Sequence, residues 1–342
     1  MDNASPLPRL AAPLAPAGSI RLPSPALGLF RMPEGYVLLS RDGAFFSTDL
    51  AGTEQVMRFG GAPVHEDFDD GPPRIFEAAG MLFAFWRGDR DQWFTRDGTT
   101  WDRLPLPAFH DRRRLDWRGV LETPDGLCVW GSYTRDNAEI GFGDDLIYDS
   151  YFVGAALFEG PEPERLAFTG TFEDCFDRYT VTGLACAQGR LAALCASEPP
   201  RKGSLVCAFR DAGGAFQPAA PMDIEDYGVS VRDYKINFAY NRIKLYAFQD
   251  RLYARGRSLY EVDPATGVLA DVHPTRVPNS FEYVKEFAGV LYYRGTALWT
   301  SADMVRWEIF CEDASFGQSF VVEGNRFTAV AADGTVLRSR LA

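Results

Sequence analysis

The chain has 342 residues, of which 46% are hydrophobic and 14% aromatic, so an intrinsically disordered polymer is excluded. Its formal net charge of -12 argues against nucleic acid or an anionic membrane as the main partner, because surfaces that bind phosphate are basic. The charge allows a cationic partner, or nothing more than good solubility. No run of 18 apolar residues exists, and residues 1–22 lack a basic start followed by an apolar region. We therefore expect no transmembrane helix and no secretory signal, and we expect a cytoplasmic protein.

One sequence pattern recurs seven times along the chain: an apolar run, a turn with Gly or Asp, and a second apolar run. The turns are Glu34-Gly35, Ala79-Gly80, Asp125-Gly126, Gln188-Gly189, Gln249-Asp250, Ala288-Gly289 and Gly324-Asn325. Repeats at this spacing predict an array of like units, each of which buries its faces against its neighbours.

Each unit is predicted to contain four strands, here called a, b, c and d from first to last. In chain order the units cover approximately 27–60, 73–106, 115–169, 178–220, 235–273, 281–311 and 319–342. Strand b is continuously apolar in several units, as in Met81–Arg87, which indicates a sheet covered on both faces. In the fifth unit strand a is placed at Ile236–Tyr240 or slightly later.

The last unit lacks one strand, because the chain ends after Thr335–Leu341. The segment 5–22 can supply it, through Leu7–Leu14 or Ser19–Leu22, and this pairing would remove the open edge of an unfinished array. The sequence thus predicts an all-β fold. It is a seven-bladed β-propeller of four-stranded antiparallel blades, formed by 1–342 as a single domain and closed by an N-terminal strand that completes the last blade.

Six cysteines are present, and none forms a C-x-x-C pair: Cys128, Cys175, Cys186, Cys195, Cys207 and Cys311. Four of them lie in apolar strand-like runs, where a free thiol behaves as a small hydrophobic group. We expect buried free thiols. The alternative is a disulfide between Cys195 and Cys207 across one hairpin, which would matter only in an oxidising compartment.

The long connections all belong to one end of the predicted sheets, because the b–c turns and the d-to-a crossings share an end in a four-strand meander. Long loops on one face of a rigid scaffold usually carry binding or catalysis. Four crossings contain an acidic pair: Glu66-Asp67, Glu173-Asp174, Glu225-Asp226 and Glu312-Asp313. An arginine follows several of them at or near the next strand a, as Arg74, Arg178 and Arg232 do.

Such carboxylates can bind a hard cation, receive a basic partner, or act as general acid and base. The structural alternative is that they bond turn amides or form ion pairs between blades. Aromatic residues accompany them on these loops, Tyr227 among them, and aromatic rings beside carboxylates suit sugars. The only three histidines, His65, His110 and His273, match no zinc pattern.

Two c–d turns resemble known motifs. Residues 95–101, Thr-Arg-Asp-Gly-Thr-Thr-Trp, resemble the Asp-box hairpin of sialidases and other propellers, shortened by one residue. Residues 301–308 resemble the Ser-x-Asp-Leu-x-x-Trp hairpin of sugar-cleaving propeller enzymes. In both, the Asp would bond turn amides and the Trp would pack between blades. The motifs lie opposite the long loops, so they favour the fold rather than an activity.

Phe30-Arg31-Met32-Pro33 is similar to the Phe-Arg-Ile-Pro motif of sialidases. The resemblance implies that Arg31 binds a substrate carboxylate. A sialidase also needs two further arginines, a tyrosine and an aspartic acid, for which Arg178, Arg232, Tyr283 and Asp67 are candidates.

Three functions follow. The first is a non-catalytic binding propeller whose long-loop face takes a cationic protein segment, a metal ion or a polar small molecule. Its expected ligand-binding residues are Glu66, Asp67, Arg74, Glu173, Asp174, Arg178, Glu225, Asp226, Tyr227, Arg232, Glu312 and Asp313. The second is a glycoside-acting enzyme, with Asp67, Asp174 and Asp226 as catalytic candidates. Carboxyl groups about 5–5.5 Å apart would retain configuration, and groups about 6.5–9.5 Å apart would invert it. The third is a scaffold whose charges only pair with one another. No cofactor is predicted, Ca²⁺ is the candidate ion, and a monomer is expected.

Overall fold

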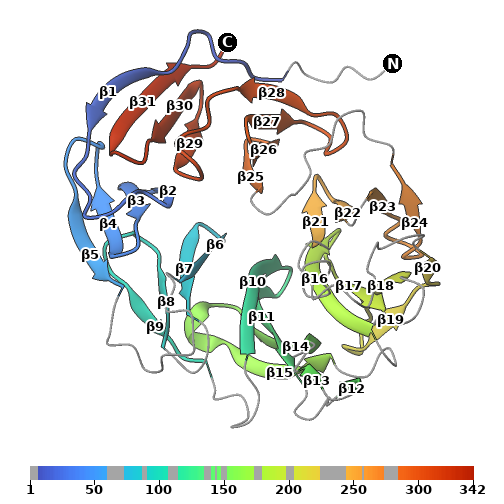
Figure 1. Ribbon diagram of the computed structural model, residues 1–342. Helices are drawn as coiled ribbons and strands as arrows, with labels where there is room; N and C mark the ends of the chain where they lie inside the picture. Colours follow the sequence, from blue (N-terminus) through green and yellow to red (C-terminus); the bar gives the residue numbers. More distant parts are fainter. Residues whose placement is uncertain are drawn as a thin grey trace. The chain divides into compact units, whose positions relative to one another are not determined.

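The computed structural model describes residues 7–59, 73–86, 91–106, 115–134, 140–142, 145–147, 152–172, 179–197, 204–223, 244–255, 258–272 and 284–342. Its described elements are strands and one short 3-10 helix (Figure 1). Apart from one two-stranded hairpin, they form seven antiparallel sheets of four or five strands, which we call blades one to seven. The fold is therefore all-β and a seven-bladed β-propeller, as predicted.

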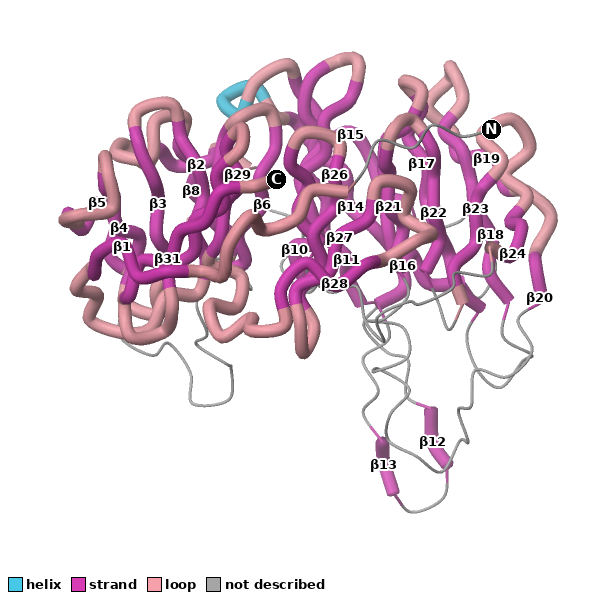
Figure 2. The backbone as a smooth tube through the Cα atoms, turned by 90° about the horizontal axis from the view of Figure 1, so that it is seen from above, coloured by secondary structure: helices cyan, strands magenta, loops and turns pink. Residues whose placement is uncertain are grey.

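The first three blades follow the chain from residue 28. Blade one contains β2 (Gly28–Met32), β3 (Gly35–Leu39), β4 (Gly43–Ser47) and β5 (Glu54–Arg58). Blade two contains β6 (Arg74–Ala78), β7 (Met81–Phe85), β8 (Gln92–Thr95) and β9 (Asp102–Leu104). Blade three contains β10 (Leu115–Thr123), β11 (Gly126–Thr134), β14 (Phe152–Gly160) and β15 (Ala167–Phe172), with the 3-10 turn Pro163–Arg165 between the last two. Its b–c connection holds a separate hairpin of β12 (Ile140–Phe142) and β13 (Asp145–Ile147), drawn in Figure 2.

The remaining blades complete the array. Blade four contains β16 (Tyr179–Ala187), β17 (Arg190–Ser197), β18 (Ser204–Arg210) and two short strands that both pair with β18, β19 (Phe216–Pro218) and β20 (Met222–Asp223). Blade five contains β21 (Lys244–Phe248), β22 (Arg251–Arg255), β23 (Leu259–Val262) and β24 (Leu269–Asp271). Blade six contains β25 (Val284–Phe287), β26 (Val290–Arg294), β27 (Leu298–Ser301) and β28 (Glu308–Cys311). Blade seven contains β29 (Phe320–Glu323), β30 (Arg326–Val330), β31 (Thr335–Arg340) and β1 (Ala15–Ser19).

The two ends of the chain meet in blade seven, as the sequence predicted. Strand β1 pairs antiparallel with β31, and Leu10 forms an isolated bridge with Leu341 (Figure 1). The strand itself lies at Ala15–Ser19, within the predicted range 5–22, and it shares Ser19 with the second of the two candidate segments. In blade five strand a is Lys244–Phe248. The predicted range 236–240 lies outside the described residues, and the later placement is the one observed.

The chain divides into two compact units. Unit 1 comprises 1–84, 93–103 and 274–342, and unit 2 comprises 85–92 and 104–273. In unit 1 one apolar cluster joins blades six and seven through Tyr292, Phe320 and Phe327, and another joins blade seven to blade one. In unit 2 the clusters join blade three to four and four to five. Every residue of β3 is buried, which confirms that strand b is covered on both faces.

Four of the a–b turns share one backbone conformation. Both central residues have positive φ at Ala79-Gly80, Gln188-Gly189, Gln249-Asp250 and Ala288-Gly289. Two successive positive φ angles define the type I′ turn, whose twist matches a tight hairpin. Glycine accepts this conformation without strain, whereas Ala79 and Ala288 adopt it with a Cβ atom.

Three c–d turns share one construction. Leu50, Gly98 and Met304 have φ angles of 64°, 85° and 65°. Each follows an aspartate whose Oδ1 accepts hydrogen bonds from backbone amides two or three residues later in the chain. Asp49 accepts from Ala51, and Asp97 accepts from Thr99 and Thr100. Asp303 accepts from Val305 and Arg306. The indole of Trp307 is buried and donates to the Met304 carbonyl at 2.7 Å. These contacts tie the chain between strands c and d, and the turn in blade one is a third example that the sequence had not singled out.

The cysteines of the described residues are free thiols. Cys195 stands opposite Val206, and Cys207 stands opposite Leu194, in the β17–β18 ladder. Their side chains therefore point to opposite faces of blade four, Cys195 toward blade three and Cys207 toward blade five. The alternative of a Cys195–Cys207 disulfide is wrong for this reason.

Candidate functional site

Most of the predicted ligand-binding residues lie outside the described residues. These are Glu66, Asp67, Glu173, Asp174, Arg178, Glu225, Asp226, Tyr227 and Arg232, together with Tyr283 of the sialidase resemblance. Asp67, Asp174 and Asp226 are the three catalytic candidates, so the catalytic hypothesis stays a prediction. Arg74, Glu312 and Asp313 lie within the described residues. Arg74 begins β6, at the start of a strand a as predicted.

The described acidic pair lies on the crossing from blade six to blade seven. Glu312 and Asp313 are both exposed. Asp313 Oδ1 accepts the Ser315 amide at 3.0 Å, and the Asp313 carbonyl oxygen lies 3.0 Å from the Cys311 thiol. Ala314 and Phe316 follow and are buried, so this crossing is anchored between blades. Asp313 thus serves a turn, whereas the neighbouring Glu312 carboxylate extends into solvent.

The structure brings together a different set of charges on the strands a of unit 1. The centre of this set is Lys285 of β25. Its Nζ atom donates to the carbonyl oxygens of Leu29 at 2.9 Å, Gln318 at 2.9 Å and Phe320 at 3.0 Å. An ammonium group has three donors, and here each has an acceptor. Lys285 therefore links blade six to the inner edges of blades one and seven.

Two aromatic rings complete the surroundings of this ammonium. Nζ lies 4.7 Å from the centroid of the Phe30 ring and 4.9 Å from that of Phe320, within the range of a cation–π contact. Burial lowers the pKa of Lys285 to about 8, and the Glu77 carboxylate on β6 acts in the opposite direction. Partial desolvation raises the pKa of Glu77, and the charge on Lys285 lowers it. The contacts of the Lys285 ammonium are thus three backbone carbonyls and two aromatic rings.

A second cluster joins blades seven and one. Arg31 Nε lies 2.7 Å from Glu323 Oε1, and the Tyr36 hydroxyl donates to Glu323 Oε2 at 2.6 Å. The same guanidinium donates to the carbonyls of Met32 and Gly35 and lies over the Tyr36 ring at 4.9 Å. The sialidase resemblance implied that Arg31 binds the carboxylate of a substrate. The carboxylate that it binds here belongs to Glu323 of the chain itself.

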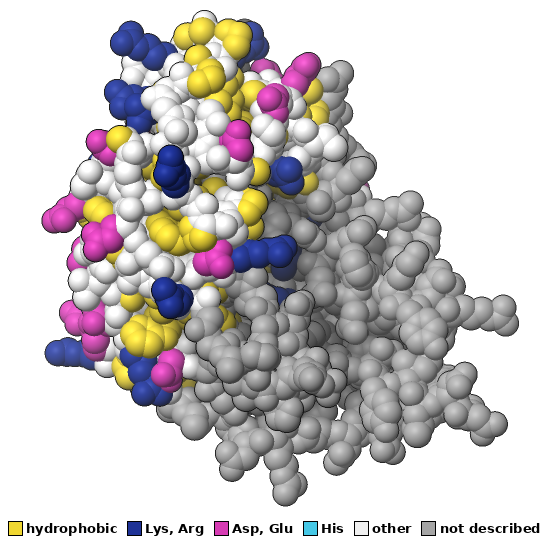
Figure 3. All heavy atoms as spheres, turned by 60° about the vertical axis from the view of Figure 1, so that its left-hand side comes forward, with side chains coloured by type: hydrophobic (Ala, Val, Ile, Leu, Met, Phe, Trp, Pro, Cys, Tyr) yellow, Lys and Arg dark blue, Asp and Glu magenta, His cyan; other side chains and the backbone are white. Residues whose placement is uncertain are grey.

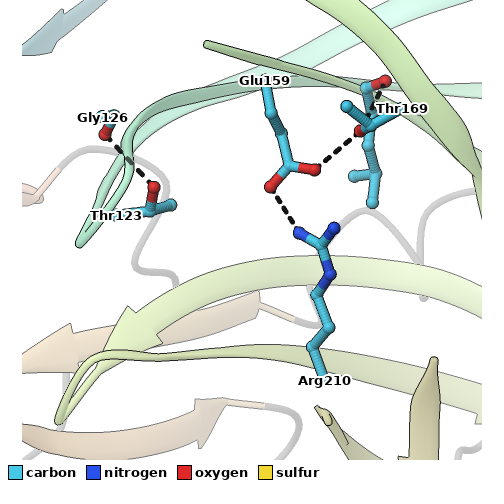
Figure 4. A network of polar contacts seen from close by, with 6 residues as sticks. Thr123, Gly126, Glu159, Thr169 and Arg210 are labelled. Atoms are coloured by element: carbon cyan, nitrogen blue, oxygen red, sulfur yellow. Dashed lines mark hydrogen bonds and ion pairs between the residues drawn. The ribbon is translucent and has the colours of Figure 1, made fainter. Parts of the chain in front are cut away.

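Unit 2 contains a comparable link between blades three and four (Figure 4). Arg210 of β18 pairs with Glu159 Oε1 of β14, and Thr169 of β15 donates to Glu159 Oε2 at 2.6 Å. The Glu159 hydrogen bond is the main cause of the raised pKa of Arg210. Both side chains are less than a third exposed. This contact is an ion pair between blades, the structural arrangement that the sequence left open as an alternative for its carboxylates.

The chemistry available to the described residues is that of structural pairing. Among them no group of three His, Cys, Asp or Glu side chains could hold a metal ion. Burial raises the pKa of the Cys128 and Cys207 thiols to about 12, so neither is an activated nucleophile. On the face shown in Figure 3, basic and acidic side chains are interspersed with apolar ones. Within the part of the chain that the structure describes, no helix is long and apolar enough to cross a membrane.

Lys285, Glu77 and Glu323 were not predicted as part of any site. A single lysine in the strand sequence Val-Lys-Glu-Phe gives little signal, and its acceptors are backbone carbonyls, which leave no trace in the sequence. The one available signal was a lysine in a predicted strand a. A charge in the innermost strand of a propeller blade needs hydrogen-bond acceptors from neighbouring blades.

Two solved structures share the fold over nearly the whole chain. Streptogramin B lyase aligns with a TM-score of 0.52 and 7% identity over 95% of this chain and 96% of its own. Sqt1 of Saccharomyces cerevisiae aligns with a TM-score of 0.53 and 8% identity over 98% of this chain and all (100%) of its own. Identities this low show the fold alone. No family model and no curated protein matches the sequence.

Proposed function

We propose that this protein is a non-catalytic binding propeller whose b–c and d-to-a connections receive a basic protein segment. The supporting observation is the contrast between two kinds of carboxylate. Those of Glu323 and Glu159 are engaged by Arg31 and Arg210 of neighbouring blades. Glu312, on a described d-to-a crossing, is exposed, while its neighbour Asp313 shapes the turn.

The other three acidic pairs have the same place in the repeat, between strand d of one blade and strand a of the next. If each follows the pattern of Glu312-Asp313, each crossing offers at least one solvent-facing carboxylate. Several such carboxylates attract a cationic segment by long-range electrostatics, which raises the association rate and makes binding sensitive to salt. The net charge of -12 acts in the same direction.

The solved structures do not decide between binding and catalysis. One of them is named a lyase, so the fold can carry an enzyme, but a 7% identity transfers no residue and no activity to this chain. We propose the cytoplasm as the compartment, supported by the free thiols of the described cysteines. The alternatives for the same carboxylates are a calcium ion or a polar small molecule, and we propose that the protein is a monomer.

The test compares two variants with equal loss of negative charge. One carries D67N, D174N, D226N and E312Q on the crossings. The other carries E54Q, D102N, E162Q and E164Q, exposed positions of blades one to three away from the crossings. An oligo-arginine peptide is titrated into each protein by calorimetry at low and high salt.

We expect the crossing variant to bind at least about tenfold more weakly than the natural protein, which corresponds to about 1.4 kcal/mol, and the matched variant to bind nearly as well. Equal losses in both variants would reduce the effect to net charge and refute a specific face. Hydrolysis of any member of an aryl glycoside panel, lost in D67N, D174N or D226N, would instead establish the glycoside-acting enzyme. A shift of the melting midpoint by Ca²⁺, lost in the crossing variant, would place a metal ion there.

A further inference from the structure

The outermost strand of blade seven is held almost entirely by its backbone. All five residues of β1, Ala15–Ser19, are exposed. The strand pairs with β31 from Ala15 opposite Arg338 to Ser19 opposite Thr335, and its register shifts between Pro16 and Gly18. Backbone pairing of this kind depends little on which side chains the strand carries.

Side chains on either side of β1 supply the specific contacts. Leu10 and Leu14 are partly buried against the cluster of blades six and seven. Ile20 is 3% exposed and belongs to the cluster between blades seven and one. The N-terminal segment therefore uses an extended backbone with a few apolar anchors, which is how peptides bind when they add a strand to a sheet edge.

Further contacts keep the segment in register with the end of the chain. The Ala11 amide donates to the Arg340 carbonyl at 2.8 Å, and the Ala342 amide donates to the Arg9 carbonyl at 2.8 Å. The Ser339 hydroxyl donates to the Ala12 carbonyl at 2.7 Å, and Arg9 reaches Glu308 at 3.3 Å. Each of these lies at an exposed position, where water competes with the contact.

The outer edge of β1 is a poor place for another strand to add. Pro16 lies within β1 and has no backbone N–H, and prolines in sheets are confined to edge strands. A further strand must therefore displace β1 in order to pair with β31. Segments with few buried side chains and exposed backbone bonds open locally at a small fraction of the cost of global unfolding.

We propose that the edge of β31 is a strand-acceptor site, which residues 9–19 occupy reversibly and which the same segment from a second copy of this chain can occupy in their place. The exchange would join two copies without any new interface, because the contacts made in the dimer are those of the monomer.

The first experiment removes residues 1–19 and supplies them in trans. A fluorescent peptide of residues 7–19 is titrated into the truncated protein, and its anisotropy and the melting midpoint are followed. We expect saturable binding and a rise of the midpoint. A matched peptide with L10D and L14D should bind at least about tenfold more weakly, because its two partly buried anchors are lost. No binding to a folded truncated protein would overturn the proposal, as would equal binding of both peptides.

A second protein covers the case in which the truncated chain does not fold. A protease site is placed between Pro23 and Ser24, and the full-length chain is folded and then cut. Incorporation of the labelled peptide into the cut protein supports a reversible strand, and retention of the original segment without incorporation refutes it. Arg21, Pro23 and Pro25 are exposed, which favours an insertion here, whereas Leu22, Ser24 and Ala26 are partly buried and the Ser24 hydroxyl accepts the Arg41 amide at 3.2 Å.

The variant S19C/T335C tests whether a second copy supplies the strand. These two residues are direct partners in the ladder, a separation that suits a disulfide. Oxidation at low concentration should lock β1 within one chain and abolish peptide incorporation, and reduction should restore it. Oxidation after refolding at high concentration should give dimers in which position 19 of one copy is linked to position 335 of the other, as peptide mapping can establish; S19C or T335C alone cannot form this link. Only intramolecular disulfides at every concentration would contradict exchange between copies.

Discussion

Lys285 shows how one side chain can hold three blades of a propeller. Strand a lies at the inner edge of its blade, so some of its backbone carbonyls have no partner strand. Unpaired polar groups at a sheet edge must bond to other groups or to water. The carbonyls of Leu29, Gln318 and Phe320 share a single ammonium group. Replacement of Lys285 by methionine removes all three donors at once while it keeps most of the volume.

We expect K285M to destabilise the protein near neutral pH by about 1–3 kcal/mol, because the carbonyls lose their partners. The pH dependence has a definite sign. Since burial lowers the pKa of Lys285 to about 8, the folded chain releases this proton before the unfolded chain, whose lysine titrates near 10.4. Between these values the unfolded state binds more protons, so the unfolding free energy rises with pH.

Denaturant titrations of the natural protein and K285M from about pH 7 to pH 10.5 check this prediction. The stability advantage of the natural protein should grow above about pH 8, by at most about 3 kcal/mol in all. K285R is the control, because its guanidinium stays charged over this range. An advantage that shrinks with pH would mean that the carbonyl and ring contacts of the ammonium outweigh its desolvation.

Asp97 gives a prediction at acid pH. Partial burial raises the pKa of Asp97, but hydrogen bonds from the Thr100 and Thr99 amides and the threonine hydroxyls outweigh this and lower it to about 2. A carboxyl whose pKa is lowered on folding stabilises the protein above its unfolded value near 3.9, and the contribution is lost as the pH falls toward 2.

D97A should therefore cost about 1–2 kcal/mol at neutral pH, a figure reduced from the full pKa shift because the side chain is only partly buried. The gap between D97A and the natural protein should close between about pH 4 and pH 2. Melting midpoints at a series of pH values measure it, with D102A as a control at an exposed carboxylate of the same blade. A gap that persists at the lowest pH would show that the charge is not the cause.

The turns that join strands a and b offer a prediction at the scale of an element. Ala288 is exposed and has a φ of 50°, ahead of Gly289 at 74°. A left-handed conformation costs an L-residue with a Cβ about 1–2 kcal/mol, and asparagine tolerates it best among non-glycine residues. A288N should stabilise the protein by about 0.5–1 kcal/mol, and A79N should do the same, because Ala79 has a φ of 51°.

Chemical denaturation of both variants measures the gain. A270N is the matched control, since Ala270 is exposed within the ordinary strand β24, where asparagine is unfavourable. A gain at position 270 equal to that at 288 would point to a general surface effect and would refute the turn argument.

The elements predicted best from the sequence were those with a distinctive pattern of side chains. Strands b are buried on both faces and read as continuous apolar runs, and the a–b turns carry glycine or aspartate. Strand β1 was located only to the range 5–22, for the opposite reason. The sequence was searched for apolar residues, at 7–14 or 19–22, whereas Ala15–Ser19 pairs through its backbone and exposes every side chain. An alternating pattern cannot reveal a strand that buries neither face.

The predicted site fared differently from the fold. Sequence reasoning placed charges on the crossings, of which only Arg74, Glu312 and Asp313 lie in the described part of the chain. The structure instead shows links between blades through Lys285, Arg31 and Glu323. Several of these links join residues about 250–290 positions apart, as the contact between Lys285 and Leu29 does. Such pairs become neighbours only once the ends of the chain meet in one sheet, so a local motif cannot identify them.

At the scale of the whole molecule, cysteine reactivity can report how the blades of unit 2 come apart. Cys128 and Cys195 lie in the cluster between blades three and four, and Cys207 lies between blades four and five. All three are at most 1% exposed. A disulfide reagent can reach these thiols only after the blades separate, because the thiols are buried. Burial also raises the pKa of Cys128 and Cys207 to about 12, which leaves little of the reactive thiolate.

We therefore expect at least two kinetic phases when the folded protein reacts with an aromatic disulfide near pH 8. The faster phase should include Cys186 and Cys311, which are partly exposed, although burial raises both of their pKa values. The slower phase should contain Cys128, Cys195 and Cys207 and should merge with the faster one in concentrated guanidinium. The variants C128A and C207A should each remove one equivalent from the slow phase, and C311A should remove one from the fast phase. Reaction of Cys128 as fast as Cys186 would contradict this prediction, because it would mean that blades three and four separate freely in the native state despite their shared apolar cluster.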